Sequence, residues 1–527
     1  MSTYNICLRR QKEVYNIRAR VGENLLTALQ KNHIYISAAC GGKGKCGKCK
    51  IHFTEGTTEA TEDDKIFFSE EELKKGYRLA CLSKPESDCS FELDAADESD
   101  FEVITDSLKG TASQAGQGNT DPDGYFSIAI DIGTTTIAIS LVEKNGKRVL
   151  DTVTSVNHQR FYGADVISRI QAANEGKLSE LSESIRKDLG QGILKLIDKY
   201  GYSIRKIEKI SIAGNTTMGH LLMGYSCKTL GVVPFTPVNI GIIESSFNEL
   251  FGRFSRELTE DIPVVLLPGI STYVGADITA GMLHNNFDIS DKICVLIDLG
   301  TNGEMAIGNR DRIMVTSTAA GPAFEGGNIS CGVGSIKGAI CHVSIENGHV
   351  SLETIGNDSP TGICGTGVIE TVCELLKNDL IDETGMLDED YFDDGFVLDR
   401  KADGEEISFT QADVREIQLA KSAIRAGFET LLKRYGAVYE DIDALYLAGG
   451  FGYKIDQAKA AAIGMLPEEL LPKIKAVGNS SLAGAIDFIA QSDAMERCKK
   501  IIEHSEEISL ATDKDFNRMY TEYMFFE

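Results

Sequence analysis

The sequence predicts a multidomain protein of mixed α/β and α+β class, built from a small front module and a large module with two related halves. Three observations lead to this class. The chain has 527 residues, which at about 150 residues per domain corresponds to three or four domains. Charge is distributed unevenly along the chain, and a strand-turn-strand motif with the pattern Asp-x-Gly-Thr occurs twice. With 42% hydrophobic residues, the chain has enough apolar side chains for several cores.

The front module is separated from the rest by a polar tether. Residues 1–98 hold 15 basic and 16 acidic side chains, so the later residues carry almost all of the net charge of −26. Residues 110–124 lack apolar periodicity and are rich in Gly, Ser, Gln, Asn and Asp, the composition of a flexible linker. We therefore predict a front domain at 1–98, a linker at 99–124, a first lobe at 125–290 and a second lobe at 291–527.

Composition also limits the classes of partner. A strongly negative chain repels phosphate backbones and anionic lipid, so we expect no nucleic-acid partner and no membrane partner. No apolar run reaches the roughly 18 residues of a membrane helix, and the first residues lack the apolar core of a signal peptide. We expect a cytoplasmic protein. Its 13 cysteines are an odd number, which favours metal binding or burial over a disulfide framework.

The first secondary-structure elements of the front module follow from residue alternation. Residues 3–10 and 13–20 alternate apolar and polar side chains around a short polar turn, which predicts a β-hairpin. Leu25, Leu26 and Leu29 then recur at helical spacing, which predicts a short helix ahead of a glycine-rich and cysteine-rich loop.

The cysteines of this loop predict an iron-sulfur cluster. Cys40, Cys46 and Cys49 have the spacing C-x5-C-x2-C, and Cys81 follows later. Three thiolates in one loop and a distant fourth resemble the plant-type ferredoxin pattern, so we predict one 2Fe-2S cluster. The loop glycines let the backbone wrap closely around a cluster and aim amide groups at its sulfurs. These glycines are Gly41, Gly42, Gly44 and Gly47.

Two alternatives remain at this stage. A structural zinc site more often has two CxxC pairs, and only one is present. Cys89 competes with Cys81 as the fourth ligand, although the sequence around Cys81 resembles the element that closes such a cluster more closely. The loop is also basic, either for solubility or as a dock for an acidic redox partner, through Lys43, Lys45, Lys48 and Lys50.

The duplicated turn of the large module predicts phosphate binding. In each copy an apolar strand ends in an aspartate, Asp131 or Asp298, that can hold Mg²⁺ or its water. The glycine that follows lets the backbone approach a ligand, and the hydroxyls and amides of the turn grip phosphate oxygens. The predicted phosphate-binding residues are Gly133, Thr134, Thr135, Gly300, Thr301 and Asn302.

A third glycine turn predicts an adenosine site. Gly449, Gly450 and Gly452 follow an apolar strand, and bare backbone there can accept adenine and ribose. Residues 214–216 are their counterpart in the first half. Glu304 either positions the attacking water or is an ordinary strand residue, and Glu325 either reaches Mg²⁺ or ribose or lies in a structural turn.

This set of motifs resembles the ATPase superfamily of acetate and sugar kinases, heat-shock chaperones and actin. The resemblance implies a two-lobed ribonuclease-H-like (actin-like) fold with ATP between the lobes. Further stretches resemble those of the reductive activators of corrinoid proteins, which join such an ATPase to a β-grasp ferredoxin-like domain. These stretches are 163–170, 318–340, 362–370 and 413–424. We expect no additional domain between the linker and the first lobe.

The resemblance implies an ATP-hydrolysing iron-sulfur reductase that restores the corrinoid protein of a methyltransferase system by reducing Co(II) to Co(I). Its implied cofactors are one 2Fe-2S cluster, ATP and Mg²⁺, and a low-potential donor supplies electrons. A homodimer is left open, as is the identity of the methyl donor. Two alternatives have different signatures: an activator of a radical dehydratase shares one cubane cluster between two subunits, and a small-molecule kinase phosphorylates an added acid or sugar.

Overall fold

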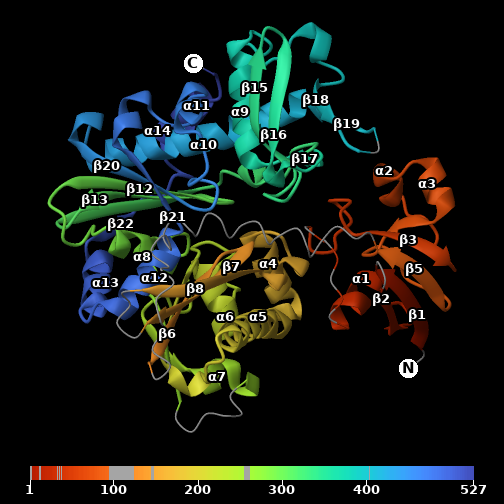
Figure 1. Ribbon diagram of the computed structural model, residues 1–527, viewed down its shortest axis with the longest axis horizontal. Helices are drawn as coiled ribbons and strands as arrows, with labels where there is room; N and C mark the ends of the chain where they lie inside the picture. Colours follow the sequence, from red (N-terminus) through yellow and green to blue (C-terminus); the bar gives the residue numbers. More distant parts are fainter. Residues whose placement is uncertain are drawn as a thin grey trace.

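The computed structural model describes residues 3–10, 13–32, 34, 36, 38, 40–93, 124–143, 148–254, 261–402 and 404–526. The predicted linker, 99–124, lies outside these residues apart from Gly124. Three parts are visible in Figure 1: the front module at one side, the two lobes, and a smaller sheet-and-helix unit that projects from the second lobe. Within the described residues, none of the helices combines the length and apolarity that crossing a bilayer requires.

The front module is a five-stranded sheet with the order β2-β1-β5-β3-β4. The predicted hairpin is present, and its first strand also pairs in parallel with β5, as in a β-grasp fold. Helix α1 packs on the sheet through Leu25, Leu26 and Leu29, all buried, as predicted. The elements are β1 Thr3–Arg10, β2 Glu13–Arg20, α1 Leu25–Lys31, β3 Lys50–Glu55, α2 Asp64–Phe67, α3 Glu70–Lys75, β4 Tyr77–Leu79 and β5 Cys89–Leu93.

The first lobe is built on a six-stranded sheet with the order β10-β11-β9-β6-β7-β8. Strand β6 pairs antiparallel with β7 and parallel with β9. The lobe comprises β6 Phe126–Ile132, β7 Thr136–Glu143, β8 Val149–Val156, η2 His158–Phe161, α4 Val166–Ala172, η3 Ala173–Lys177, α5 Leu178–Lys199, η4 Ile204–Lys206, β9 Ile207–Gly214, α6 Thr216–Met223, β10 Ile243–Ser246, α7 Phe247–Phe251, η5 Gly252–Phe254, β11 Pro263–Leu266 and α8 Ala276–His284.

The second lobe repeats this pairing in the sheet β21-β20-β12-β13-β14-β22, where β12 pairs antiparallel with β13 and parallel with β20. The duplicated motif therefore reflects two related half-folds. The core elements are β12 Ile293–Leu299, β13 Gly303–Asn309, β14 Arg312–Thr318, η6 Ala323–Glu325, α10 Gln411–Tyr435, η9 Tyr439–Asp441, β20 Ile442–Ala448, α11 Gln457–Ala462, η10 Glu468–Lys473, β21 Ile474–Gly478, α12 Ser480–Ala490, α13 Ala494–Glu503, β22 Ser505–Glu507 and α14 Lys514–Glu522.

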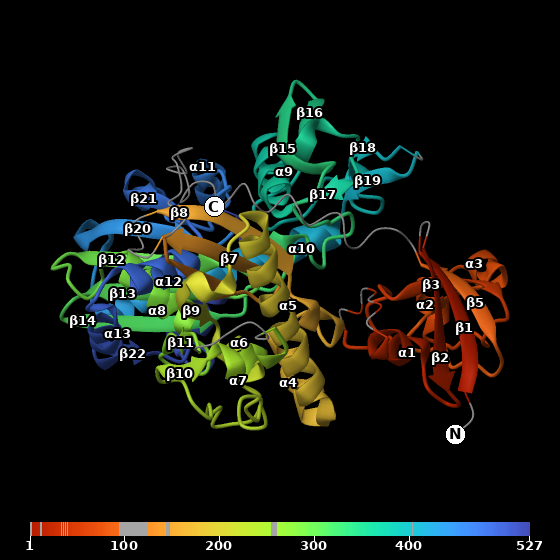
Figure 2. The same cartoon turned by 60° about the horizontal axis from the view of Figure 1, so that its bottom comes forward.

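The projecting unit is inserted between η6 and α10. Its three-stranded sheet has the order β16-β15-β17, and a two-stranded ribbon, β18-β19, lies near it (Figures 1 and 2). The unit comprises β15 Ala339–Glu346, β16 His349–Thr354, η7 Ile355–Asn357, β17 Gly362–Ile363, α9 Gly365–Lys377, η8 Glu389–Tyr391, β18 Phe396–Arg400 and β19 Glu406–Phe409.

The two lobes pack together through helices α8 and α12. One buried apolar cluster contains residues of both lobes, including Ala129 and Ala213 of the first and Leu296 of the second. At the helix crossing the backbones approach so closely that a Cβ on Gly484 would lie 2.0 Å from the carbonyl oxygen of Ala280. This close packing holds the ends of β6 and β12, and so the two predicted phosphate turns, near each other.

Candidate functional site

The structure gathers the four predicted cluster cysteines at one end of the front module. Cys49 and Cys81 are buried, and their sulfur atoms lie 3.4 Å apart. Cys40 and Cys46 are half-buried and hydrogen-bond to each other. Cys89 instead sits in β5 opposite Ile6, where burial raises the pKa of its thiol to about 11. The geometry thus groups Cys81, and not Cys89, with the loop cysteines.

Backbone amides surround these sulfurs, although burial raises the pKa of the Cys46 thiol and the hydrogen bond with Cys81, together with burial, raises that of Cys49. Burial opposes ionisation of Cys40, but hydrogen bonds from the amides of Lys45 and Lys43 outweigh it and lower the pKa of this thiol. The Cys81 thiol also has a lowered pKa, first because of its hydrogen bond with Cys49 and also because of the Gly44 amide. Amide groups that point at sulfur stabilise thiolates, which are the form that binds iron.

All four loop glycines have positive φ, as their predicted role requires. Gly47 has φ +66°, and a Cβ there would lie 2.5 Å from the Phe67 ring. A side chain at this position would both strain the backbone and displace the ring, so the loop can keep its path only with glycine.

The two phosphate turns lie at the interface between the lobes. Asp131, at the end of β6, accepts hydrogen bonds from Asn479 Nδ2 and from Ser481 Oγ, each at 2.7 Å. Both donors come from the start of α12 in the second lobe. Asn215, in the predicted counterpart turn, donates to Thr134 Oγ1 at 3.1 Å. Sequence reasoning did not identify Asn479 or Ser481.

A cluster of carboxylates connects the two turns, and it includes Asp277, which sequence reasoning missed. Burial raises the pKa of Asp298 to about 7, and the charges of Asp277 and Asp131 add to the rise. Burial likewise raises the pKa of Asp277 to about 7, in spite of a hydrogen bond from the Ile278 amide. Carboxylates that repel one another in a desolvated site favour a cation among them.

Glu304 and Glu325 occupy different places in this site. Glu304 lies on β13 directly opposite Asp298, and burial together with the neighbouring acidic charges raises its pKa well above the usual range. Glu325 is exposed and accepts hydrogen bonds from Thr301 of the second turn, at 3.2 Å, and from Thr135 of the first. Glu325 therefore bridges the two phosphate turns.

The predicted adenosine turn adjoins the second phosphate turn. A Cβ on Gly449, whose φ is +91°, would lie 2.8 Å from Asp298 Oδ1. A Cβ on Gly450 would meet no atom within 4 Å, so its face is open, whereas one on Gly452 would strike the Ala448 carbonyl at 2.3 Å. Phe451 stacks on Phe324 with ring centroids 5.1 Å apart.

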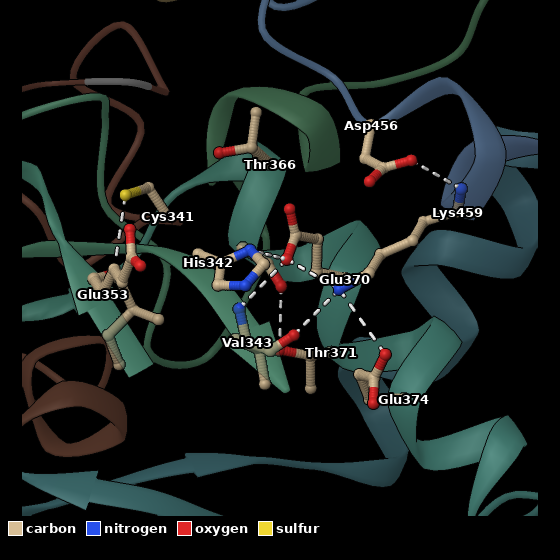
Figure 3. Close-up of polar contacts among 12 residues, drawn as sticks. Cys341, His342, Val343, Glu353, Thr366, Glu370, Thr371, Glu374, Asp456 and Lys459 are labelled. Atoms are coloured by element: carbon tan, nitrogen blue, oxygen red, sulfur yellow. Dashed lines mark hydrogen bonds and ion pairs between the residues drawn. The ribbon is translucent and has the colours of Figure 1, made fainter. Parts of the chain in front are cut away.

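An ion network fixes the helix that follows this turn. Lys459 of α11 donates to Glu370 Oε2 and to the Val343 carbonyl, each at 2.9 Å (Figure 3). Glu370 also contacts His342 Nδ1 at 2.6 Å and accepts from the Val343 amide at 3.1 Å. Because Glu370 lies on α9, the network ties α11 to the inserted unit.

The carboxylates do not by themselves form a metal cage. In the part of the chain that the structure describes, Asp131, Asp277, Asp298 and Glu304 are not arranged as a ready-made cage of three or more metal ligands. A surface hollow of about 680 Å³ lies elsewhere, between α5, α6 and α7, and none of the predicted site residues lines it. The residues that converge are those of the two turns and the carboxylates between them.

We predict that Asp298→Asn stabilises the ligand-free protein more at pH 8 than at pH 5. Because the folded-state pKa of Asp298 is about 7 and an unfolded aspartate has a pKa of about 3.9, its contribution to stability is fully present below about pH 4 and is lost as pH rises to about 7. Thermal unfolding midpoints at the two pH values test this. Asp443→Asn, which breaks an ion pair with Lys292, is the control. An equal gain in unfolding midpoint at both pH values for Asp298→Asn would contradict the prediction.

Family models match three regions of the chain. A 2Fe-2S iron-sulfur cluster binding domain matches residues 10–86. The middle region of RACo matches residues 126–290, and the C-terminal domain of RACo, described as the ASKHA domain, matches residues 292–527. The matched middle region spans the residues of the predicted first lobe, 125–290, apart from its first residue.

Relatives along most of the chain carry related names. The corrinoid activation enzyme RamQ of Eubacterium limosum is 28% identical over 92% of this chain and 93% of its own length. A Co(II) methylated amine-specific corrinoid protein reductase of Methanosarcina barkeri is 27% identical over 75% of this chain and 76% of its own. A solved structure of a reductive activator for corrinoid, iron-sulfur protein superposes with a TM-score of 0.68 and 29% identity, over 99% of this chain and 98% of that one.

The predicted fold class is confirmed by these matches and by the sheets: a ferredoxin-type front domain precedes a two-lobed, actin-like ATPase fold. The two RACo models together span both lobes, and the relatives and the solved structure agree in their described activity. Over nearly its whole length the chain is therefore similar to reductive activators of corrinoid proteins.

Proposed function

We propose that the protein reduces the cobalt of a methyltransferase system's corrinoid protein from Co(II) to Co(I), in a reaction that depends on ATP hydrolysis. A 2Fe-2S cluster held by Cys40, Cys46, Cys49 and Cys81 would supply the one electron that the cobalt gains, and a low-potential donor would replace it. The observation that carries the proposal is the presence in one chain of four grouped thiols and of two facing phosphate turns joined by Glu325.

We assign Cys40, Cys46, Cys49 and Cys81 as the cluster ligands. The donor set fits, because all four thiols are free and three of them lie in a loop whose amides already point at sulfur. A bound 2Fe-2S cluster supplies a one-electron redox centre. The chain's own contribution is to position the thiolates and to donate hydrogen bonds that tune the cluster potential.

We assign Mg²⁺ and the phosphates of ATP to the carboxylates and the two turns. Mg²⁺ usually binds one or two carboxylates together with waters and substrate phosphates, so a site without a full protein cage suits it. Asp131 and Asp298 are the proposed metal contacts, and the acidic neighbours that add to the effect of burial on the pKa of Asp298 support a cation at this place. We assign to Glu304, which lies directly opposite Asp298 on the neighbouring strand, the role of orienting the attacking water.

ATP is needed because the electron moves uphill. For one electron, a gap of about 200 mV corresponds to about 5 kcal/mol. The phosphate turns belong to different lobes that meet at α8 and α12, so a change in the bound nucleotide changes how the lobes contact each other. The protein thereby links hydrolysis to the geometry of its complex with the corrinoid protein.

The direct test is the visible spectrum of a Co(II) corrinoid protein mixed with the reduced, cluster-loaded protein. With Mg²⁺ and ATP we expect the Co(II) bands to give way to those of Co(I). With ADP, or without nucleotide, the conversion should be slow. An equal rate of Co(II) reduction with and without ATP would contradict the proposal that reduction depends on ATP hydrolysis. Phosphorylation of an added acid or sugar would indicate a kinase instead.

A further inference from the structure

The cluster loop of the front module is seated on the first lobe. Gln30 of α1 donates to the carbonyl of Phe161 at 2.6 Å, and Lys43 hydrogen-bonds to Gln171 of α4. The backbones are also close, because a Cβ on Gly41 would lie 3.1 Å from the carbonyl oxygen of Tyr162. Both views show α1 and its neighbouring loop facing α4 (Figures 1 and 2). Hence the seat for the loop is formed by the segment that runs from η2 into α4.

The same segment is attached to the first phosphate turn. Asn157, directly before η2, is buried; its amide donates to the Thr135 carbonyl and its side chain to the Gly133 carbonyl, each at 2.9 Å. Only a few residues of chain therefore separate a turn that binds phosphate from the carbonyls that meet the front module.

Arg169 forms a second link between these two places. It donates through Nε to the Gly163 carbonyl at 2.9 Å and through a terminal nitrogen to the Thr134 carbonyl at 2.5 Å. Its third donor faces the sulfur of Met218 at 3.3 Å. The side chain is fully buried, and burial lowers its pKa to about 9.

No carboxylate neutralises this arginine at short range. Among the ion pairs of the described residues, none includes Arg169, and its nearby acidic neighbour, Asp165, hydrogen-bonds to Ser168 instead. A buried cation that has only carbonyl and thioether partners is poorly compensated. It will respond strongly to an anion placed nearby, because electrostatic interactions are strong in a desolvated site.

We propose that Arg169 is a positioning residue through which phosphate bound at the first turn releases the front module from its seat on the first lobe. Phosphate at Thr134 and Thr135 attracts the guanidinium, whose rigid plane then gives up its hydrogen bond to the Gly163 carbonyl. The seat shifts and the loop is freed to approach a partner protein. This inference rests on the proposed function in one respect, that the turn binds the phosphates.

Thermodynamic linkage makes the proposal measurable from either side. If nucleotide weakens docking, then docking weakens nucleotide binding by the same factor. A substitution that loosens docking should therefore tighten nucleotide binding, even though it lies in the other module. Gln30→Ala removes such a contact, that with the Phe161 carbonyl.

The experiment is a double-mutant cycle in the full-length, cluster-loaded protein, with the dissociation constant of a slowly hydrolysed ATP analogue and Mg²⁺ as the readout. We expect Gln30→Ala to lower this constant about threefold in the wild-type background and to leave it unchanged in the Arg169→Met background. Arg186→Met is the matched control, since Arg186 is a half-buried arginine of the same lobe that donates to the Leu222 carbonyl. In that background the threefold effect should persist.

Amide hydrogen exchange gives a second readout. In the wild type the analogue should speed exchange at residues 40–43 and 161–163, and in Arg169→Met it should not. If Arg169→Met fails to fold, Arg169→Lys takes its place. Lysine keeps the charge but cannot hydrogen-bond to both carbonyls at once, so the effect of Gln30→Ala on the dissociation constant should be smaller than threefold.

An unchanged dissociation constant in Gln30→Ala, or the same threefold effect with Met at position 169, would overturn the proposal. Either result would leave the proposed function intact, because nucleotide would still bind. A failure of the wild type to bind the analogue would instead refute the proposed function, and this inference with it.

Discussion

Asp131→Asn is expected to reduce ATP-dependent reduction of a Co(II) corrinoid protein by about a hundredfold or more, with the visible iron-sulfur spectrum unchanged. Asparagine keeps the shape of the side chain and can still pair with Ser481, but it removes the charge that we propose holds Mg²⁺. A metal contact to transferring phosphate is worth several kcal/mol, and about 1.4 kcal/mol corresponds to a tenfold change in rate. Rates of ATP hydrolysis and of Co(I) formation should fall together.

The iron-sulfur spectrum should be unchanged because the front module has its own sheet and its own buried core. Asp151→Asn is the matched control: this aspartate of the same lobe pairs with Lys199 on the surface, at 2.5 Å, and should leave both rates near normal. Hydrolysis at the wild-type rate in Asp131→Asn would mean that the first turn is only structural, and the assignment of Mg²⁺ there would be withdrawn.

Much of the fold could be predicted because its signals are local. The alternation of residues 3–20 and the helical spacing of the leucines predict β1, β2 and α1, and each forms as expected. The duplicated Asp-x-Gly-Thr turn predicts two half-folds, and the sheets repeat the same pairing around β6 and β12. The inserted unit at β15–β19 was not foreseen, because it has no counterpart in the first half.

The missed site residues share one cause. Asp277 and Ser481 are brought to the turns by the packing of α8 against α12, which is a contact between distant parts of the chain. A signal was nevertheless present, since residues 275–281 and 478–484 both read Gly-x-x-x-x-Ala-Gly. This second internal repeat marks the starts of the two interlobe helices. Comparison of the halves beyond the first turn would have revealed it.

The role of Arg169 has no sequence signal of its own. An arginine in a short helix is typical of a solvent-exposed face, and its full burial follows only from the position of α4 beside the Thr134 carbonyl. The sequence left open whether the basic loop serves solubility or docks an acidic partner, and it did not indicate that Lys43 contacts Gln171 of the same chain. Non-local packing determines both features.

Cys81→Ser is expected to remove most of the visible absorption and to abolish Co(II) reduction, whereas Cys89→Ser should keep both. Cys81 is buried 3.4 Å from the Cys49 sulfur and receives a hydrogen bond from the Gly44 amide. Serine is a poor ligand for iron at neutral pH because its hydroxyl resists deprotonation. Loss of one ligand therefore opens the cluster to solvent and to iron release.

Cys89 is the matched control because it is also a buried thiol of the same module. It pairs with Ile6 in the sheet, and burial raises the pKa of its thiol to about 11. Iron per chain, visible absorption and the reduction rate should be measured on both variants and the wild type. Cys89→Ser should match the wild type in iron content, apart from a modest loss of thermal stability. If Cys89→Ser lost the iron and Cys81→Ser kept it, the fourth ligand would be Cys89, and the loop would have to reach β5 by a path that differs from the one seen here.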